Sequence, residues 1–232
     1  ARVDQIWPWL KAHHGNVLAV DAPYASPPES FNYSEVAEKI VVAASAFQSF
    51  GIKQGEVVAL FSENGPRWLV TDQAIMRAGA IDAVRGATAP EEELKYIIED
   101  SQAIALVVQT SDLWQRLDLS EYQRSRLKLV LQLEGPPCDE VCGWESFLDK
   151  GKEALLKTSS HGTKAKFEDT AIATILYTSG TTGKPKGVPL SHRNLLHQIR
   201  SLACIANPSP GAPVLSVLPI WHSYERSAEY YF

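Results

Sequence analysis

The sequence predicts an α/β fold in which mostly parallel strands form a sheet flanked by helices. Short apolar runs rich in Val, Ile and Leu alternate along the chain with segments whose apolar residues recur every three or four positions. Strands that alternate with helices indicate β–α–β units, whose sheets are mostly parallel and covered on both faces. The 232 residues, 45% of them apolar, can bury a substantial core in one large domain or two small ones.

Helix boundaries are marked by residues with known capping chemistry. Asn32 and Glu35 are spaced as a capping pair at the start of a helix that ends at Gly51. Pro66 suits the first turn of another helix, which extends to about Ala78. The other predicted elements are strands at residues 57–61, 81–84, 104–108, 127–131, 171–177 and 214–218, helices at residues 91–100 and from Ser191 to about residue 203, and a polar connection at residues 159–166.

Charge and cysteine usage narrow the classes of partner. The formal net charge of -5 argues against nucleic acid as the main partner, because binding to phosphate backbones requires a basic surface. The three cysteines, Cys138, Cys142 and Cys204, are too few and too irregularly spaced for a disulfide framework or a zinc site, so we expect free thiols. No apolar run reaches the ~18 residues needed to span a bilayer.

The segment 178–187 holds four hydroxyl residues, three glycines and two lysines, directly after a predicted strand. Glycine lets backbone N–H groups turn toward a ligand, hydroxyl groups add donors and lysine adds positive charge, which together favour polyphosphate binding. The segment is not a Walker motif, since Pro185 stands where the Mg²⁺-binding Ser or Thr would follow Lys184. It also lacks the dinucleotide-binding glycine spacing. The alternative is an ordinary surface loop, because loops rich in Gly, Ser and Thr are common.

The order of residues in this segment, YTSGTTGKPKG at 177–187, resembles the signature of the adenylate-forming superfamily. That superfamily contains acyl-CoA and acyl-carrier-protein synthetases, luciferases and the adenylation domains of peptide synthetases. FNYSEVAEKI, IMRAGAIDAVRGATAPEEELKYIIEDSQA and LPIWHSYERSAEYYF resemble further motifs of the family, in its order. SENGPRWLVTDQAIMRAGAIDAVRG and HRNLLHQI are most similar to plastid and cyanobacterial long-chain acyl-acyl-carrier-protein and acyl-CoA synthetases. The resemblance implies that residues 1–232 are the N-terminal part of the large AMP-binding domain, without the downstream motifs and the C-terminal domain.

The resemblance also implies roles for individual residues. Lys186 is favoured over Lys184 for the charge contact with ATP, and Thr181 or Thr182 could join the phosphates in binding Mg²⁺. Trp221 and His222 would line the acyl site, although a core tryptophan and a buried histidine are the alternative interpretation. We expect Arg226 to pair locally with Glu225 or Glu229. The complete set expected to bind the β- and γ-phosphates is Thr178, Ser179, Gly180, Thr181, Thr182, Gly183 and Lys186.

The function implied by the resemblance is ATP-dependent activation of a long-chain fatty acid through an acyl-adenylate. Transfer to acyl carrier protein or coenzyme A would follow, in a plastid or a cyanobacterial cell, with peripheral contact to a membrane. No carboxylate precedes Glu225 in the stretch after Trp221, so a substrate ammonium would lack a partner and an acid without an amine is favoured. We expect this chain alone to be inactive, because the nucleoside-binding motifs are missing from it. The alternative is a natural short protein that binds a nucleotide or a partner without catalysis.

Overall fold

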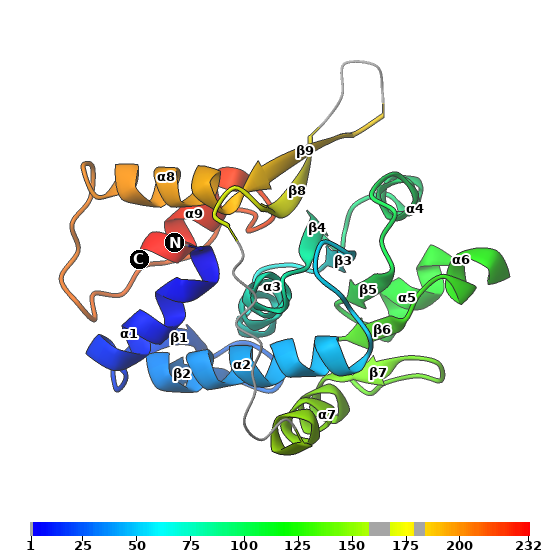
Figure 1. Ribbon diagram of the computed structural model, residues 1–232, viewed down its shortest axis with the longest axis horizontal. Helices are drawn as coiled ribbons and strands as arrows, with labels where there is room; N and C mark the ends of the chain where they lie inside the picture. The colour runs from blue at the N-terminus through cyan, green and yellow to red at the C-terminus, as the bar shows by residue number, and fades with distance from the viewer. Residues whose placement is uncertain (1, 158–167, 179–183) are drawn as a thin grey trace.

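The fold is a twisted sheet with helices on both faces (Figure 1), and the computed structural model describes residues 2–157, 168–178 and 184–232. Within these residues the main sheet has seven strands in the order β7-β6-β5-β3-β4-β8-β9, and all neighbours are parallel except β8 and β9. The predicted α/β class and mostly parallel sheet are therefore confirmed. The strands are β3 (Val57–Phe61), β4 (Ile81–Arg85), β5 (Ala105–Val108), β6 (Leu129–Gln132), β7 (Cys142–Gly143), β8 (Ile172–Thr178) and β9 (Lys186–Ser191).

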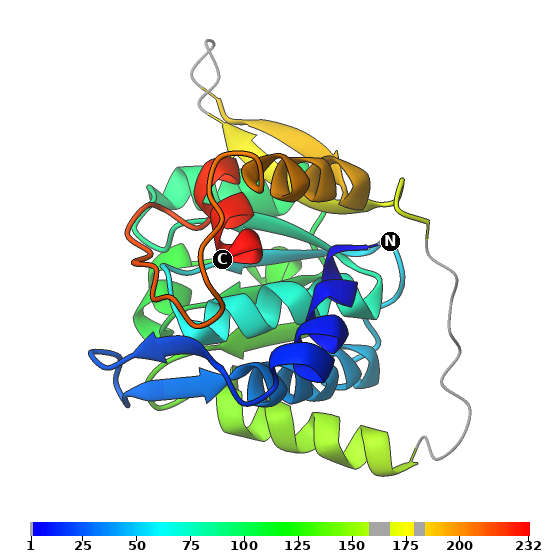
Figure 2. The same ribbon diagram turned by 90° about the vertical axis from the view of Figure 1, so that its left-hand side faces the viewer.

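Helices cover the sheet in two groups, and a short antiparallel hairpin of β1 (Leu18–Ala22) and β2 (Glu29–Asn32) lies beside the first group. Helices α8 and α9 lie together near the β8–β9 end of the sheet (Figure 2). The first group consists of η1 (Val3–Gln5), α1 (Ile6–His14), α2 (Tyr33–Ser49), α3 (Pro66–Ala78), α7 (Trp144–Lys157), α8 (His192–Leu202) and α9 (Ser223–Tyr231). The second group consists of α4 (Glu91–Asp100), α5 (Ser111–Leu117) and α6 (Glu121–Ser125).

The sheet divides the buried apolar residues into two clusters, one on each face. Successive side chains of a strand point to opposite faces, and β3 shows the result. Val58 and Leu60 join the cluster under the first group of helices, whereas Ala59 and Phe61 join the cluster under α4 and α5. Both faces of the central strands are therefore buried, as the continuous apolar strand sequences predict.

The predicted helix boundaries are confirmed where capping residues mark them. The Asn32 side chain accepts a hydrogen bond of 2.9 Å from the Glu35 N–H group, and Glu35 accepts one of 2.8 Å from Asn32. Pro66 is the first residue of α3, and Gly79 ends that helix in the left-handed conformation with φ of 84°. Ser191 caps α8 as expected. Local chemistry therefore determines these ends.

The predicted strand at residues 214–218 is wrong. Its apolar side chains, Val214, Leu215, Val217 and Leu218, are exposed, and no described strand lies beside it. A strand needs a hydrogen-bonded neighbour, and the described part of the chain offers none here. The hairpin β1–β2, helix α7 and strand β9 were not predicted, and the polar connection at residues 159–166 lies outside the described residues.

The three cysteines are free thiols, as their spacing predicts. Within residues 2–157, 168–178 and 184–232, no helix combines the length and apolar character needed to cross a bilayer.

Candidate functional site

The candidate site lies at the carboxyl ends of the parallel strands. Asn64 follows β3, Gly86 follows β4 and Thr178 ends β8, and these three strands run in the same direction. Ligands of open α/β sheets bind along this edge, because the loops that follow parallel strands gather there. The segment before α9 also reaches this edge, so chain parts far apart in the sequence meet at it.

The glycine-rich segment joins β8 to β9 as a hairpin. Thr178 and Lys186 are directly opposite each other in the antiparallel pair. Of the predicted phosphate-binding residues, only these two are described by the structure, and Ser179, Gly180, Thr181, Thr182 and Gly183 lie outside the described residues. Lys186 belongs to strand β9 rather than to the connecting segment.

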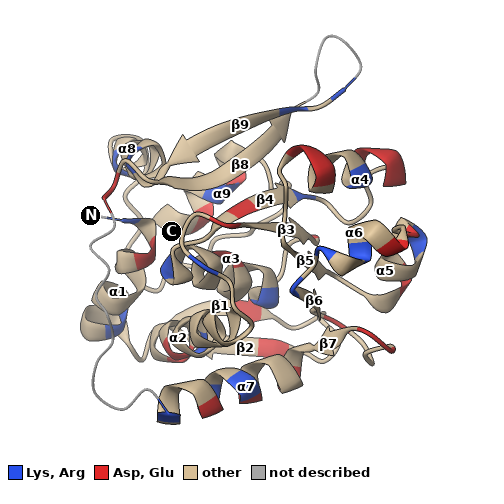
Figure 3. Ribbon diagram, turned by 45° about the vertical axis from the view of Figure 1, so that its right-hand side comes forward, with Lys and Arg blue, Asp and Glu red and all other residues tan. Residues whose placement is uncertain are grey.

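Strand geometry indicates which face Thr178 and Lys186 occupy. Thr174 of β8 is buried against Arg226 of α9, and Thr178 follows at an even spacing on the same strand. Because alternate residues share a face and opposed residues of a pair share one too, Thr178 and Lys186 lie on the α9 side of the sheet. Lys184 instead has its ammonium group 5.5 Å from the ring centre of Tyr96 in α4, on the other side. Figure 3 shows the basic start of β9 near the acidic helix α4.

Tyr177 anchors the base of this hairpin on the α4 side. Its hydroxyl group donates a hydrogen bond of 2.8 Å to Asp100, the last residue of α4. Burial, and then the hydrogen bond to Asp100, raise the pKa of Tyr177, so the hydroxyl group stays protonated and keeps donating. The Tyr177 ring also covers Gly187, where a Cβ atom would lie 3.1 Å from ring carbon Cζ. The absence of a side chain at Gly187 therefore lets the ring close over β9.

Trp221 packs directly on Gly86. A Cβ atom at Gly86 would lie 2.6 Å from Cη2 of Trp221, so any larger residue at this position would displace the indole ring. Trp221 is half-buried and packs against the core cluster of the first face. The structure thus places one predicted acyl-site residue at the carboxyl end of β4.

His222 is exposed and caps α9. Its Nδ1 atom accepts a hydrogen bond of 3.3 Å from the Tyr224 N–H group. Because Nδ1 acts as the acceptor, the neutral ring carries its proton on Nε2, which can donate to a ligand. The alternative interpretation of a buried histidine is wrong for this position.

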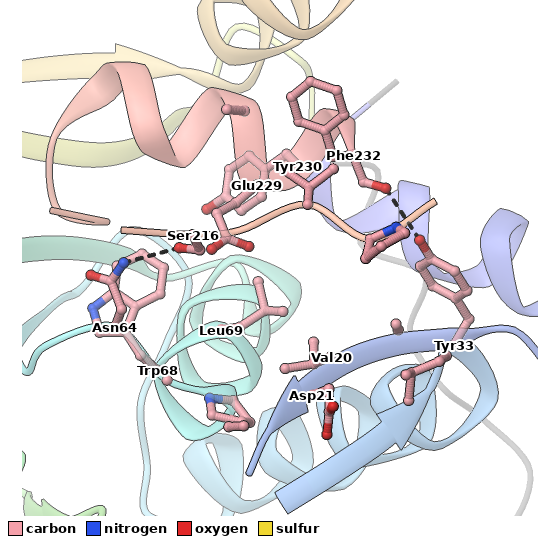
Figure 4. A pocket seen from close by; sticks show the side chains of 18 of the residues that line it. Val20, Asp21, Tyr33, Asn64, Trp68, Leu69, Ser216, Glu229, Tyr230 and Phe232 are labelled. Carbon is pink, nitrogen blue, oxygen red and sulfur yellow. Dashed lines mark hydrogen bonds between the residues drawn. The ribbon is translucent and has the colours of Figure 1, made fainter. Parts of the chain in front are cut away.

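Asn64 holds the segment that leads to these two residues. Its side-chain NH₂ group donates to Ser216 Oγ at 3.0 Å (Figure 4). The same group donates to the Leu218 carbonyl group at 2.8 Å, and the Asn64 Oδ1 atom accepts from the Ile220 N–H group at 3.0 Å. Three hydrogen bonds from one side chain therefore fix an otherwise irregular segment to the carboxyl end of β3.

The predicted local ion pair of Arg226 with Glu225 or Glu229 is wrong. Arg226 is fully buried and binds Asp72 of α3 and Asp82 of β4 instead. Glu225 accepts a hydrogen bond of 3.0 Å from Ser216. The side chain of Arg226 points into the protein, where the two buried carboxylates need a cation, and this tertiary arrangement overrides spacing along the helix.

A cavity of about 1250 Å³ lies between the β1–β2 hairpin, α3, α9 and the segment around Ser216 (Figure 4). Its lining includes Tyr33, Trp68 and Glu229, and burial raises the pKa of the Glu229 carboxyl group. Trp221 and His222 are absent from its walls, and so are Thr178 and Lys186. The cavity is therefore separate from the predicted phosphate and acyl positions.

The described residues contain no group of three or more His, Cys, Asp and Glu side chains that could hold a metal ion.

Comparison with known proteins decides the family. Residues 9–232 match the family described as AMP-binding enzyme. The chain belongs to this family. As a member, it is 38% identical over 99% of its length to "Probable acyl-activating enzyme 16, chloroplastic" of Arabidopsis thaliana, covering 34% of that protein. It is 36% identical over 99% of its length to a chloroplastic long-chain-fatty-acid–[acyl-carrier-protein] ligase of the same plant, covering 33% of that protein.

A solved relative has the same architecture. The crystal structure of a long-chain-fatty-acid-CoA ligase from Archaeoglobus fulgidus superposes with a TM-score of 0.79 and 25% identity, over 100% of this chain and 44% of that one. The chain thus spans about a third of the length of the two curated plant relatives of the AMP-binding family.

Sequence patterns alone missed several residues at this edge. Asn64 contacts Ile220, Gly86 contacts Trp221 and Asp100 contacts Tyr177. The sequence around each of these residues does not predict its partner, because the partners are distant in the chain. Asp82 carried the clearest signal, since it is a charged residue with apolar neighbours on both sides, Ile81 and Ala83. A buried position for such a residue predicts a paired cation.

Proposed function

We propose that this chain forms the phosphate-binding part, and a portion of the acyl-binding part, of a ligase that activates a long-chain fatty acid with ATP. The fatty-acid carboxylate attacks the α-phosphorus atom, pyrophosphate leaves, and the acyl-adenylate then passes its acyl group to a thiol. The protein positions the two anions and neutralises the charge that develops on the leaving group.

The observation that carries the proposal is the glycine-rich hairpin at the carboxyl edge of the sheet. Lys186 lies on the face of the sheet that also carries α9, whose start is capped by His222. A cation for the phosphates and a donor for a carboxylate are therefore offered from one side of the sheet. Residues 179–183 would add backbone and hydroxyl donors on the same hairpin.

The donor set fits ATP, because the segment 178–187 combines glycine backbone, hydroxyl groups and lysine charge and its sequence contains no Asp or Glu. Thr181 or Thr182 would hold Mg²⁺ together with phosphate oxygen atoms. When bound, the ion neutralises charge on the pyrophosphate group.

The acid is proposed to lack an amine. Near the exposed His222 ring the chain places Trp221, Ser223 and Tyr224, and the next carboxylate, Glu225, is buried and bound to Ser216. A substrate ammonium would find no charged partner from this segment. The acyl site is assigned to Trp221 and His222 rather than to the large cavity, since the reacting carboxylate must lie beside the phosphates.

The thiol acceptor is proposed to be acyl carrier protein or coenzyme A, and the location a plastid. Similarity to the two plant relatives supports the acceptor and the location. One of these relatives is named for acyl carrier protein, and the names of both describe them as chloroplastic. An assay with each acceptor in turn distinguishes the two.

Fatty-acid-dependent exchange between ATP and radiolabelled pyrophosphate, in the natural full-length polypeptide that contains this chain, tests the proposal. We expect exchange with long-chain acids, a loss of roughly 100-fold in Lys186→Ala and a change of only a few-fold in Lys184→Ala. If the protein is folded and catalyses no exchange between ATP and pyrophosphate with any acid tested, the ligase proposal is overturned. The remaining interpretation is then a binding protein without catalysis.

We also propose that residues 1–232 alone do not catalyse exchange, since they span about a third of the plant relatives. Turnover by this segment, purified and shown to be folded, would contradict that proposal.

A further inference from the structure

Arg226 is the centre of a buried polar cluster that the proposed reaction does not use directly. Arg226, Asp72 and Asp82 are all fully buried. The Arg226 Nη2 atom donates to both carboxylate oxygen atoms of Asp82, at 2.8 and 3.0 Å, and also to Asp72. Its Nη1 atom donates to Thr174 Oγ1 at 2.6 Å, and its Nε atom donates to the Tyr230 hydroxyl group at 2.8 Å. Every nitrogen atom of the guanidinium group therefore has a partner.

The cluster joins four elements of the fold. Asp72 lies in α3, Asp82 in β4, Thr174 in β8, and Arg226 with Tyr230 in α9. The hydroxyl group of Thr174 also donates to Asp82 at 2.6 Å, so β8 is bonded to its neighbour β4 and to α9 through one side chain.

Each end of the cluster is close in sequence to one half of the proposed site. Thr174 precedes Thr178, where the glycine-rich hairpin leaves β8, by four residues, or roughly 13 Å of extended strand. Arg226 follows His222 by four residues, or roughly 6 Å along the helix. The guanidinium group therefore connects the strand that presents the phosphate-binding segment to the helix that begins at the acyl site.

Stability does not explain this arrangement well. A buried ion pair is often no more stabilising than well-packed apolar residues of the same volume, because removing charges from water is costly. The negative charge of two carboxylates, Asp72 and Asp82, would also exceed the single positive charge of Arg226. Burial, opposed by the charge of Arg226 and reinforced by Asp72, raises the pKa of Asp82 to about 7, so the cluster can take up a proton that balances its charge. The planar guanidinium group of Arg226 does, however, fix the direction of each hydrogen bond that it donates.

We propose that Arg226 is a positioning residue for acyl-adenylate formation, which sets the placement of the acyl-site segment relative to the phosphate-binding hairpin. This inference rests on the proposed function. Arg226 touches neither reactant. It holds α9 and β8 in one geometry, so that the carboxylate and the α-phosphate meet at bonding distance.

The kinetic test compares Arg226→Lys with Phe147→Leu in the natural full-length polypeptide. Lysine keeps the buried charge but cannot bind Asp82, Thr174 and Tyr230 together. Phe147 is fully buried in α7, away from α9, and its truncation serves as a control that weakens the core. Thermal midpoints show whether the two variants are destabilised comparably, and all rates are measured where both are folded.

We expect Arg226→Lys to lower kcat for pyrophosphate exchange at least 10-fold, with KM for ATP changed less than KM for the fatty acid. We expect Phe147→Leu to keep the wild-type kinetics. Wild-type kcat and KM values in Arg226→Lys, or equal losses in both variants, would overturn the positioning role.

Hydrogen–deuterium exchange without any ligand keeps the inference separate from the proposed function. We expect faster amide exchange in residues 219–231 of Arg226→Lys, and no such change in Phe147→Leu. If the wild-type protein catalyses no exchange between ATP and pyrophosphate with any fatty acid, the proposed function fails. The amide exchange still decides whether Arg226 fixes the start of α9, and unchanged protection in Arg226→Lys would overturn that.

Discussion

The hydroxyl group of Tyr177 donates a hydrogen bond of 2.8 Å to the Asp100 carboxylate, which joins the end of β8 to the end of α4. Tyr96, one helical turn before Asp100, donates to the same carboxylate at 3.1 Å. The glycine-rich segment, residues 178–187, begins immediately after Tyr177. This pair of residues therefore fixes the end of β8, from which the proposed phosphate-binding segment continues.

Replacing Tyr177 with phenylalanine removes this hydrogen bond and leaves the ring in place. We expect the free energy of unfolding to fall by about 1 kcal/mol, since a single side-chain hydrogen bond contributes that order of magnitude. Chemical denaturation measures it. Tyr122→Phe removes an exposed hydroxyl group and serves as the control. A loss in Tyr177→Phe no larger than in the control would contradict the anchoring role.

Adding a methyl group at Gly86 should displace Trp221, because the new Cβ atom would lie 2.6 Å from the indole ring. In the natural full-length polypeptide we expect Gly86→Ala to raise KM for the fatty acid roughly tenfold, which corresponds to about 1.4 kcal/mol, and to leave KM for ATP nearly unchanged. Gly65→Ala is the matched control, since a Cβ atom there meets no atom within 4 Å. Equal changes in KM for the fatty acid in Gly86→Ala and Gly65→Ala would rule out Trp221 as a wall of the acyl site.

Asn64→Ala should release the segment before α9. The substitution removes three hydrogen bonds, to Ser216, Leu218 and Ile220, while the backbone groups of the last two remain in the protein. We expect residues 214–220 to become more susceptible to limited proteolysis, with cleavage rates raised several-fold. Asn16→Ala, an exposed asparagine remote in sequence, is the control. Cleavage at the wild-type rate would show that the hydrogen bonds of Asn64 do not hold the segment.

His192 should make stability depend on pH. Burial, and then the charge of Arg2, lower its pKa from 6.5 to about 4, and its Nδ1 atom accepts from the Val3 N–H group. Between these two values the unfolded chain binds a proton that the folded protein does not. The contribution is therefore complete above pH 6.5 and is lost as pH falls toward 4, by up to about 3 kcal/mol.

Unfolding free energies of wild type and His192→Asn at pH 7 and pH 5 measure this effect. Asparagine keeps an acceptor near the Nδ1 position but does not titrate, so we expect the variant to lose less stability on acidification. The exposed residue His13 provides the control substitution, His13→Asn. Identical pH dependence in His192→Asn and wild type would exclude His192 as the source.

Local chemistry explains which parts of the fold were predictable. Asn32 with Glu35, and Gly79 after α3, encode helix ends within a few residues, and the structure has those ends. The segment 214–218 has equally apolar residues but forms no strand, because strand formation requires a neighbour that the segment itself does not encode. Periodicity predicts elements well only where they are locally encoded.

The candidate site also has a part that could be predicted from consecutive residues and a part that could not. The order of residues 177–187 was sufficient to predict the family, because that signature is carried by consecutive residues. The placement of Trp221 on Gly86 could not be predicted, since the contact joins residues distant in sequence. The phosphate-binding roles of all seven residues, Thr178 and Lys186 included, remain predictions.

The sequence by itself determined the α/β class, the helix caps and the membership of a nucleotide-binding family, because each depends on neighbouring residues. Only the tertiary structure decided the partners of Arg226. Its charge could be satisfied by Glu225 or Glu229 along the chain, yet burial against Asp72 and Asp82 prevails. Two carboxylates within the core would be strongly destabilising without a cation, whereas Glu225 accepts a hydrogen bond from Ser216 and does not depend on Arg226.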